Sequence, residues 1–375
     1  MRAAPNTGFP PMTTLNAQIE ALLRPEARAL SAYHVPESKG FIKLDAMENP
    51  YAWPKDTLDA CVQQLRWAEP DRDPDPVCAA LKAALKAANG VPGGAELLLG
   101  NGSDEIIQML LMALNPGATV MAPEPTFVMY RQISLSLGLP FASVPLRAED
   151  FSLDGEAFLL AIEQRQPTII FLAYPNNPTG NLFDPAAIER ILAAAPGLVV
   201  VDEAYAPYAG ASFMGLVGRH PNLLVMRTLS KLGLAGLRLG FMAGPPEWIA
   251  EFDKLRLPYN INVLTRISAE FALAHHEVFA AQVAAILRDR GALMAELQHI
   301  EGIKVYASQA NFILLRLLRH EAPAVFAALK AAGILIKNLH PHGGVLSQCL
   351  RVTVGTPEEN QRFLAAFRQI MSELP

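Results

Sequence analysis

Residues 199–205 read VVVDEAY, in which three consecutive valines are followed directly by two acidic residues. A short, fully apolar run of this kind predicts a strand that is buried on both faces. Segments with helical periodicity, such as 185–195, lie between several runs of the same kind. This alternation predicts an α/β fold, in which a mostly parallel sheet has helices on both faces. The runs are at 119–122, 168–173, 198–201, 223–226 and 239–243.

The C-terminal part of the chain has a different pattern. Residues 272–297 are rich in alanine and leucine and predict one long helix that could bridge two domains. Strand-like segments and two helices follow, which together predict a compact α+β unit. The strand-like segments are 304–307, 312–317 and 350–354, and the helices are 323–332 and 357–371. Near the N-terminus, residues 15–30 form an amphipathic segment.

Composition limits the kinds of partner that the chain can have. It carries 31 basic and 36 acidic side chains among 375 residues, and a net charge of −5 gives no overall attraction for nucleic acid or anionic lipid. Three cysteines without metal-ligand spacing predict neither a disulfide framework nor a metal site. We see no signal peptide, and no stretch approaches the ~20 apolar residues of a membrane span. We therefore expect a cytoplasmic protein.

Polar residues follow several of the expected strands, and ligand sites in open α/β sheets form at the carboxyl ends of strands. The first pattern, LGNGSDE at 99–105, leads into an apolar helix at 106–114. Ser103 is predicted to cap this helix, whose free N–H groups would suit a phosphate. An ordinary capped turn is the alternative, because glycine beside a capping residue is common.

Two further patterns follow the next strands. YPNNPTG at 174–180 has two prolines that fix a turn and two asparagines whose amides can donate to a ligand oxygen, with a bare turn as the alternative. Asp202 comes directly after a buried strand, where its carboxylate would raise the pKa of a nearby cationic nitrogen. A helix cap and a structural ion pair are the alternatives for Asp202.

The fourth pattern is RTLSKLGLAGLRLG at 227–240. Lys231 lies there among small and apolar residues, and burial would favour its neutral amine, the form that can make an imine with a carbonyl group. Thr228, Ser230 and Arg238 are suited to hold a phosphate together. For one lysine in a loop, a solvated charge is the alternative.

Taken in order, PNNPTG, VDEAY and TLSK with GLRLG resemble the fold-type I pyridoxal-phosphate (PLP) enzymes of aminotransferase classes I and II. The resemblance covers nearly the whole chain. It implies a large domain with a mostly parallel seven-stranded sheet between helices, and a smaller α+β domain. Softer features resemble the histidinol-phosphate aminotransferases, namely LDAMENPY at 44–51, GNGSDE at 100–105, TLSKLGLAGLR at 228–238 and LRVTVGTPEEN at 350–360.

The resemblance assigns catalytic and cofactor-binding residues. Lys231 would hold PLP as a Schiff base and later move a proton between the substrate Cα and C4′ of the cofactor. Asp202 would pair with the pyridinium nitrogen, Tyr205 and Asn177 would bond the phenolic oxygen, and Phe127 would stack on the ring. The residues implied for the phosphate are Ser103 and Asp104 through their backbone, with Thr228, Ser230 and Arg238.

The resemblance also implies substrates. Arg351 matches the arginine that grips the α-carboxylate of glutamate in bidentate geometry. Tyr33 matches a substrate-side tyrosine, and Lys337 stands where related sequences often carry arginine. The expected reaction converts histidinol phosphate and 2-oxoglutarate to imidazole acetol phosphate and glutamate. Lys337 would bind the substrate phosphate or, alternatively, be a solvated surface charge.

Other functions remain open at this stage. An aromatic-amino-acid aminotransferase or a decarboxylase of an amino-acid phosphate would share the cofactor residues. A non-enzymatic regulator with this fold would normally carry a DNA-binding module, and no basic helix-turn-helix segment precedes residue 30.

The resemblance further implies a homodimer with active sites at the interface. The family usually has Asn-Arg-Tyr-Pro where this chain has Asp71-Arg72-Asp73-Pro74, and that tyrosine reaches the partner's cofactor phosphate. Asp73 cannot make this contact, so either Trp67 or Tyr51 takes part or the contact is absent. The implied division is 1–60 for a segment that contributes to the small domain, 61–270 for the large PLP-binding domain and 271–375 for the C-terminal small domain.

Overall fold

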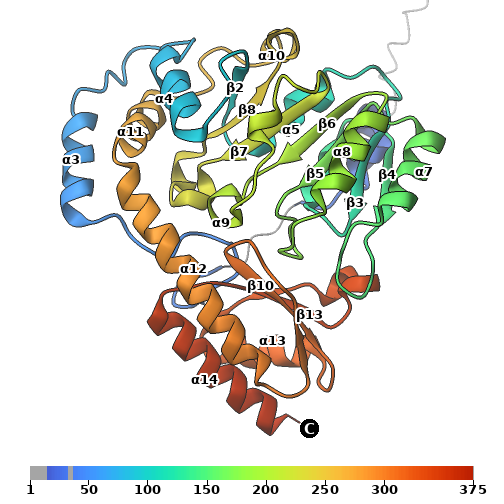
Figure 1. Ribbon diagram of the computed structural model, residues 1–375, viewed down its shortest axis with the longest axis vertical. Helices are drawn as coiled ribbons and strands as arrows, with labels where there is room; N and C mark the ends of the chain where they lie inside the picture. Colours follow the sequence, from blue (N-terminus) through green and yellow to red (C-terminus); the bar gives the residue numbers. More distant parts are fainter. Residues whose placement is uncertain (1–14, 33–36, 375) are drawn as a thin grey trace, which may run out of the picture.

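The computed structural model describes residues 15–32 and 37–374 and is built around a seven-stranded sheet (Figure 1). The strand order is β2-β8-β7-β6-β5-β3-β4. Strand β8 pairs antiparallel with β2 and β7, and the other pairs are parallel. The expected mostly parallel α/β sheet is therefore confirmed. Its strands are β2 (Glu96–Gly100), β3 (Val120–Glu124), β4 (Phe141–Pro145), β5 (Ile169–Ala173), β6 (Leu198–Asp202), β7 (Leu223–Thr228) and β8 (Gly240–Gly244).

Helices cover both faces of this sheet, which explains why the central strands are apolar throughout. Alternate side chains of one strand point to opposite faces. In β6, Val199 and Val201 pack in one core, with helices α4, α7 and α8. Leu198 and Val200 pack in the other, with α5, α6 and α10. The helices are α4 (Ala79–Asn89), α5 (Ser103–Met112), α6 (Val128–Ser136), α7 (Gly155–Arg165), α8 (Pro185–Ala194) and α10 (Pro246–Asp253).

A smaller unit follows at the C-terminus. Its four-stranded sheet has the order β12-β13-β10-β9 with antiparallel pairs. A two-residue strand near the N-terminus, β1, pairs in parallel with β11 and so lies in the same part of the molecule. The strands are β1 (Ile42–Lys43), β9 (Ile303–Val305), β10 (Phe312–Leu317), β11 (Ile334–Leu335), β12 (Lys337–Asn338) and β13 (Cys349–Thr353). The helices packed on this unit are α12 (His276–Gln298), α13 (Ala322–Ala331) and α14 (Pro357–Glu373).

The prediction of one helix over 272–297 is wrong at its N-terminal end, where the structure has the end of one helix and the start of another. Helix α11 (Val263–Ala274) ends and α12 begins on either side of His275, whose φ and ψ are −115° and 39°. The His275 ring stacks on Phe271 at 4.0 Å, and its Nδ1 lies 2.8 Å from the Phe271 carbonyl oxygen. A side chain that bonds the backbone in this way competes with the helical ladder. From this break, α12 runs from the large sheet to the C-terminal unit (Figure 1).

The remaining helices lie mostly at the surface. The amphipathic segment at 15–30 forms two short helices, neither with a buried residue. Within residues 15–32 and 37–374, no helix has the length and apolarity needed to cross a bilayer. The same ranges contain no cluster of His, Cys, Asp and Glu suited to a metal ion. The remaining surface helices are α1 (Leu15–Leu22), α2 (Pro25–Arg28), α3 (Lys55–Leu65) and α9 (Ala206–Ala209).

Candidate active site

A cavity of about 110 Å³ lies at the carboxyl ends of β5, β6 and β7. This is the edge of an open α/β sheet at which ligand sites form. Met47, Ala173, Pro175 and Ala204 form part of its wall. All the residues expected to bind the cofactor line it, although they come from distant parts of the chain: Ser103, Asp104, Phe127, Asn177, Asp202, Tyr205, Thr228, Ser230, Lys231 and Arg238.

Two glycines bring the start of α5 against strand β8 and Arg238. A Cβ on Gly240 would lie 2.8 Å from the backbone nitrogen of Ser103, and a Cβ on Gly102 would lie 2.7 Å from Nη2 of Arg238. Gly102 also has a φ of +89°, a conformation that suits glycine. Gly102 is therefore the N-cap residue and Ser103 is the first residue of the helix, so the expected Ser103 cap is wrong.

The groups around the start of α5 suit an anion. The Oγ1 of Thr228 and the Oγ of Ser230 lie 3.0 Å apart, and Nη2 of Arg238 lies 3.7 Å from Oδ2 of Asp104. Burial raises the pKa of Asp104, and Arg238 opposes this effect. Helix N–H groups, two hydroxyls and a guanidinium are the donors that a phosphate accepts from.

Asp202 ends β6 as a buried carboxyl group with two hydrogen bonds. Oη of Tyr130 donates to its Oδ2 at 2.6 Å, and the N–H of Ala204 donates to its Oδ1 at 3.0 Å. Burial raises the pKa of Asp202 to about 6, although these two hydrogen bonds act in the opposite direction. The structural ion pair considered for Asp202 belongs instead to its neighbour Glu203, whose carboxylate lies 2.7 Å from Arg227.

Lys231 points its amine towards the same cavity. Its Nζ donates to the carbonyl of Ala46 at 3.1 Å and lies 5.8 Å from the centre of the Tyr205 ring. Burial, and next the positive charge of Arg351, lower the pKa of Lys231 to about 8. A solvated lysine would keep its usual pKa near ~10.4. Lys231 therefore lines the cavity wall and bonds the backbone, and the alternative of a solvated surface charge is wrong.

Arg351 joins the C-terminal unit to the cavity wall. Its Nη1 donates to Oδ1 of Asn177 at 2.5 Å, and its Nη2 donates to the carbonyl of Asp45 at 3.0 Å. Lys337 pairs with Arg351 in the register of β12 and β13. Burial, and next Arg351, lower the pKa of Lys337, which is half-buried and not fully solvated. Neither cation lines the cavity itself, and Tyr33 lies outside the described residues.

Sequence reasoning missed two contributors to this site. Tyr130 has no exposed surface and reaches Asp202 from helix α6. No local string marks it, because its partner Asp202 lies 72 residues further along the chain. Segment 45–47 supplies backbone carbonyls to Arg351 and Lys231. LDAMENPY marked this segment, but no pattern of side chains can reveal a role played by the backbone.

The residues considered for the cross-subunit contact lie at the surface or are otherwise engaged. Asp73 is exposed, and 84% of Trp67 is exposed. Oη of Tyr51 donates to Oδ2 of Asp289 at 3.0 Å. Within one subunit, Tyr51 therefore already has a partner.

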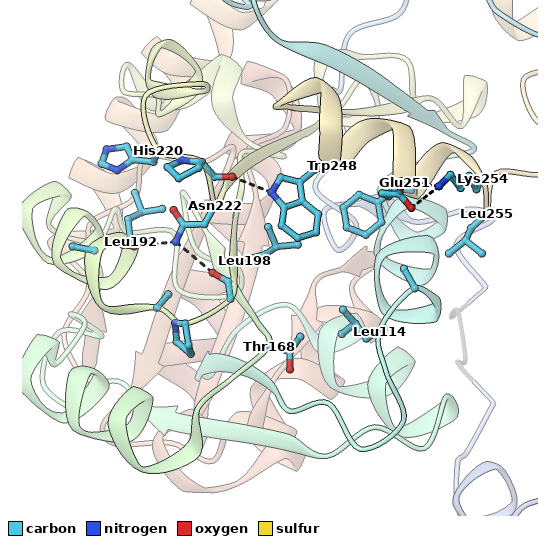
Figure 2. A pocket seen from close by; sticks show the side chains of 17 residues that line it. Leu114, Thr168, Leu192, Leu198, His220, Asn222, Trp248, Glu251, Lys254 and Leu255 are labelled. Carbon is cyan, nitrogen blue, oxygen red and sulfur yellow. Dashed lines mark hydrogen bonds and ion pairs between the residues drawn. The ribbon is translucent and has the colours of Figure 1, made fainter.

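A larger pocket, of about 1000 Å³, lies at the amino-terminal ends of β5, β6 and β7 (Figure 2). Several of its polar side chains already bond within the protein. Nε1 of Trp248 donates to the carbonyl of Pro221 at 3.0 Å, and Nδ2 of Asn222 donates to that of Leu192 at 2.9 Å. Glu251 pairs with Lys254. The smaller cavity, which brings Asp202 and Lys231 together, is therefore the candidate active site.

Comparison with known proteins agrees with this geometry. The model of the family "Aminotransferase class I and II" matches residues 70–367. The chain belongs to this family. The histidinol-phosphate aminotransferase 2 of Nitrosococcus oceani is 53% identical, over 92% of this chain and 96% of the relative. The histidinol-phosphate aminotransferase of Chromobacterium violaceum is 50% identical, over 94% of this chain and 98% of the relative.

Solved structures show the same fold. A histidinol-phosphate aminotransferase from Sinorhizobium meliloti in complex with pyridoxal-5'-phosphate has a TM-score of 0.82 at 24% identity, over 95% of this chain and 99% of that one. The enzyme from Clostridium acetobutylicum has a TM-score of 0.81 at 22% identity, over 88% and 99%. The expected fold-type I architecture is confirmed, and this aminotransferase acts on small molecules.

The residues of the cavity fit PLP, the cofactor of this aminotransferase family. Gly102 and Gly240 leave a cradle at the start of α5 that a Cβ would fill. The donors beside it suit the phosphate. The buried carboxyl of Asp202 suits a protonated ring nitrogen, and the amine of Lys231 suits an aldehyde.

Proposed function

We propose that this aminotransferase transfers an amino group between histidinol phosphate and 2-oxoglutarate, giving imidazole acetol phosphate and glutamate. The observation that carries the proposal is the sequence identity of about 50% to histidinol-phosphate aminotransferases over nearly the full length of this chain. Arg351 and Lys337 lie beside the cavity and suit anionic substrates.

PLP, when bound, supplies an electron sink for the negative charge that develops on the substrate carbon. Lys231 would hold the cofactor covalently between turnovers. During turnover its free amine would take the proton from the substrate Cα and deliver it to C4′. Burial suits Lys231 to this work, because a pKa of about 8 makes its amine a usable base near neutral pH.

The cavity walls would orient the cofactor. We assign the ring nitrogen to Asp202, the phenolic oxygen to Tyr205 and Asn177, and the face of the ring to Phe127. Asn177 also accepts from Arg351, so one side chain would connect the cofactor site with the substrate site. The groups assigned to the phosphate are the backbone at Ser103 and Asp104, with Thr228, Ser230 and Arg238.

The substrate side must accept two anions in turn. Glutamate offers an α-carboxylate, and Arg351 would grip it with two parallel hydrogen bonds. Histidinol phosphate has no α-carboxylate but brings a phosphate, which Arg351 and Lys337 together would bind. Tyr33 is assigned to the substrate on the resemblance alone.

We also propose a homodimeric, cytoplasmic enzyme. All three cysteines are free thiols, which suits a reducing compartment. Helix α3 exposes Leu58 and Val62, and Trp67 follows it with 84% of its surface exposed. Exposed apolar patches of this kind mark protein interfaces.

Substrate competition tests the proposed reaction. Purified enzyme is supplied with 2-oxoglutarate and with histidinol phosphate, phenylalanine or tyrosine, and glutamate formation is followed. Relative kcat/KM measures differential transition-state binding and should be highest for histidinol phosphate. Higher efficiency with phenylalanine or tyrosine would replace the proposal with an aromatic aminotransferase. Release of carbon dioxide from an amino-acid phosphate without glutamate would indicate a decarboxylase.

A further inference from the structure

Tyr130 makes a contact with the active site that the roles above do not use. It has no exposed surface, and its ring stacks on Phe171 of strand β5 with 4.7 Å between centroids and 12° between planes. Phe127 meets its ring edge-to-face at 5.5 Å. These two contacts hold the hydroxyl in one place, 2.6 Å from Oδ2 of Asp202.

The Asp202 carboxyl group has one donor on each oxygen. Tyr130 bonds Oδ2 and the N–H of Ala204 bonds Oδ1, so the plane of the carboxyl group is defined by two fixed donors. Only 4% of Asp202 is exposed, so bulk water has little access to take the place of either donor. A buried polar atom that loses its partner is costly, particularly when it is charged.

We infer that Tyr130 is a positioning residue, whose hydroxyl fixes the Asp202 carboxyl group and keeps it in the ionised form that pairs with the cofactor's ring nitrogen. The inference rests on the proposed function, because it gives the tyrosine a purpose only if Asp202 meets the cofactor.

The charges around Asp202 show why a donor is needed there. Burial, and then Asp104 and Glu203, favour the protonated acid, whereas the hydrogen bonds from Tyr130 and Ala204 favour the anion. Burial, and next the charge of Asp202, raise the pKa of Tyr130 well above its ordinary value. The tyrosine hydroxyl therefore stays protonated and donates a hydrogen bond to Asp202. Without the hydroxyl, the pKa of Asp202 would rise further.

Tyr130→Phe tests the inference because it keeps the ring and removes only the donor. We expect kcat to fall roughly 10- to 100-fold, since a hydrogen bond to a buried charge is lost, with a much smaller change in KM. Tyr306→Phe is the matched control. Tyr306 is also buried, but its hydroxyl has no hydrogen-bond partner in the described structure, so kcat should stay unchanged.

A double-mutant cycle with Asp202→Asn separates positioning from packing. In the Asp202→Asn background, Tyr130→Phe should change kcat by less than about twofold. An equal loss in both backgrounds, or wild-type kcat in Tyr130→Phe alone, would overturn the inference. If Tyr130→Phe does not fold, Tyr130→His decides, because it restores an N–H donor. A folded Tyr130→His enzyme without activity above that of Asp202→Asn would equally contradict it.

The cofactor-free protein gives a readout that does not depend on turnover. A folded-state pKa of about 6 for Asp202 lies above the ordinary value, so this group's contribution to stability is lost as pH rises from about 4 through 6. In Tyr130→Phe the loss should extend to higher pH, seen as a fall in the thermal midpoint that continues beyond about pH 6 and is larger in total. Identical pH profiles would count against the inference. Wild-type protein that fails to attach PLP to Lys231 would overturn the proposed function, while this measurement would still test the hydrogen bond.

Discussion

At the scale of single residues, the surroundings of each group set its chemistry. Lys231 and Lys337 are both lysines with lowered pKa values, but only Lys231 lines the cavity. Asp202 and Glu203 are adjacent acids on one strand end, yet Glu203 is neutralised by Arg227 while Asp202 meets only neutral donors. A buried carboxyl group without a cationic partner suits a cationic ligand.

Lys231 is predicted to be the attachment site of the cofactor. Purified protein should absorb in the near-ultraviolet or visible range, and borohydride should fix PLP to the peptide that contains Lys231. Lys231→Ala should lose the covalent adduct and almost all turnover. Lys337→Ala should keep the adduct, because Lys337 does not line the cavity. A reduced adduct mapped to any other lysine would contradict the assignment.

Attachment should depend on pH in a way that follows from burial. The neutral amine of Lys231 is the reactive form, and its pKa is about 8. The rate of PLP attachment to cofactor-free protein should therefore rise with pH and level off above about 8. An ordinary lysine would keep gaining rate towards ~10.4. Stopped-flow absorbance measures this rate, and the absence of a plateau below pH 9 would show that Lys231 is solvated.

At the scale of elements, the sheet could be predicted where burial is complete. Every residue of β5 and β6 is buried, and both strands were expected from their apolar runs. The expected runs include neither edge strand of the sheet, β2 or β4. Strand β4 is half-exposed, which breaks its apolar run, whereas β2 is mostly buried but has only three consecutive leucines. The two-residue strands β1, β11 and β12 are too short to show any periodicity. The break at His275 depends on one side chain bonding the backbone, which composition does not reveal.

The residues that line the cavity could be identified from the sequence because they lie in short local strings. Tyr130 could not, since its hydroxyl meets a residue 72 positions away. From sequence it is one more buried aromatic in a helix. The N-cap of α5 was placed one residue late because two candidate caps, Gly102 and Ser103, are adjacent, and only the backbone conformation distinguishes them.

Strand β8 packs closely against the start of α5 at Gly240, so we predict that a larger side chain there weakens cofactor binding. In Gly240→Ala the new Cβ would meet backbone atoms of Gly102 and Ser103, which cannot move without shifting the helix. The expected cost is about 1–3 kcal/mol of unfolding free energy, with weaker retention of PLP. Gly236→Ala is the control, because a Cβ there meets nothing within 4 Å. Urea midpoints and dialysis of bound PLP measure the two effects, and equal behaviour of both variants would refute the argument.

At the scale of the whole molecule, Arg351 connects the parts that the active site needs. It belongs to the small sheet, donates to Asn177 of the large unit, and donates also to the backbone carbonyl of Asp45. Strand β1 lies beside β11, so residues 42–43 meet residues 334–335 although almost 300 positions separate them in the sequence. The division into 1–60, 61–270 and 271–375 stays a prediction, as do the roles of the individual site residues.

The quaternary structure gives the last prediction. Helix α3 packs on α11, and together with the following loop these helices expose apolar side chains: Leu58, Val62, Trp67 and Leu264. In a dimer with two-fold symmetry, this apolar surface of one subunit would pack against the same surface of its partner. One substitution in the sequence would therefore change the interface at two places. Wild-type protein should therefore be a dimer by light scattering.

Trp67→Glu tests this surface, because it would bring a carboxylate into the interface of each subunit. We expect dissociation at higher protein concentration than in the wild type, together with loss of activity if the sites depend on both subunits. Leu160→Glu is the matched control: Leu160 is 54% exposed on α7, away from α3, and its variant should remain dimeric. A wild-type monomer that is active at assay concentration would contradict the homodimer. A dimer unaffected by Trp67→Glu would place the interface on another face.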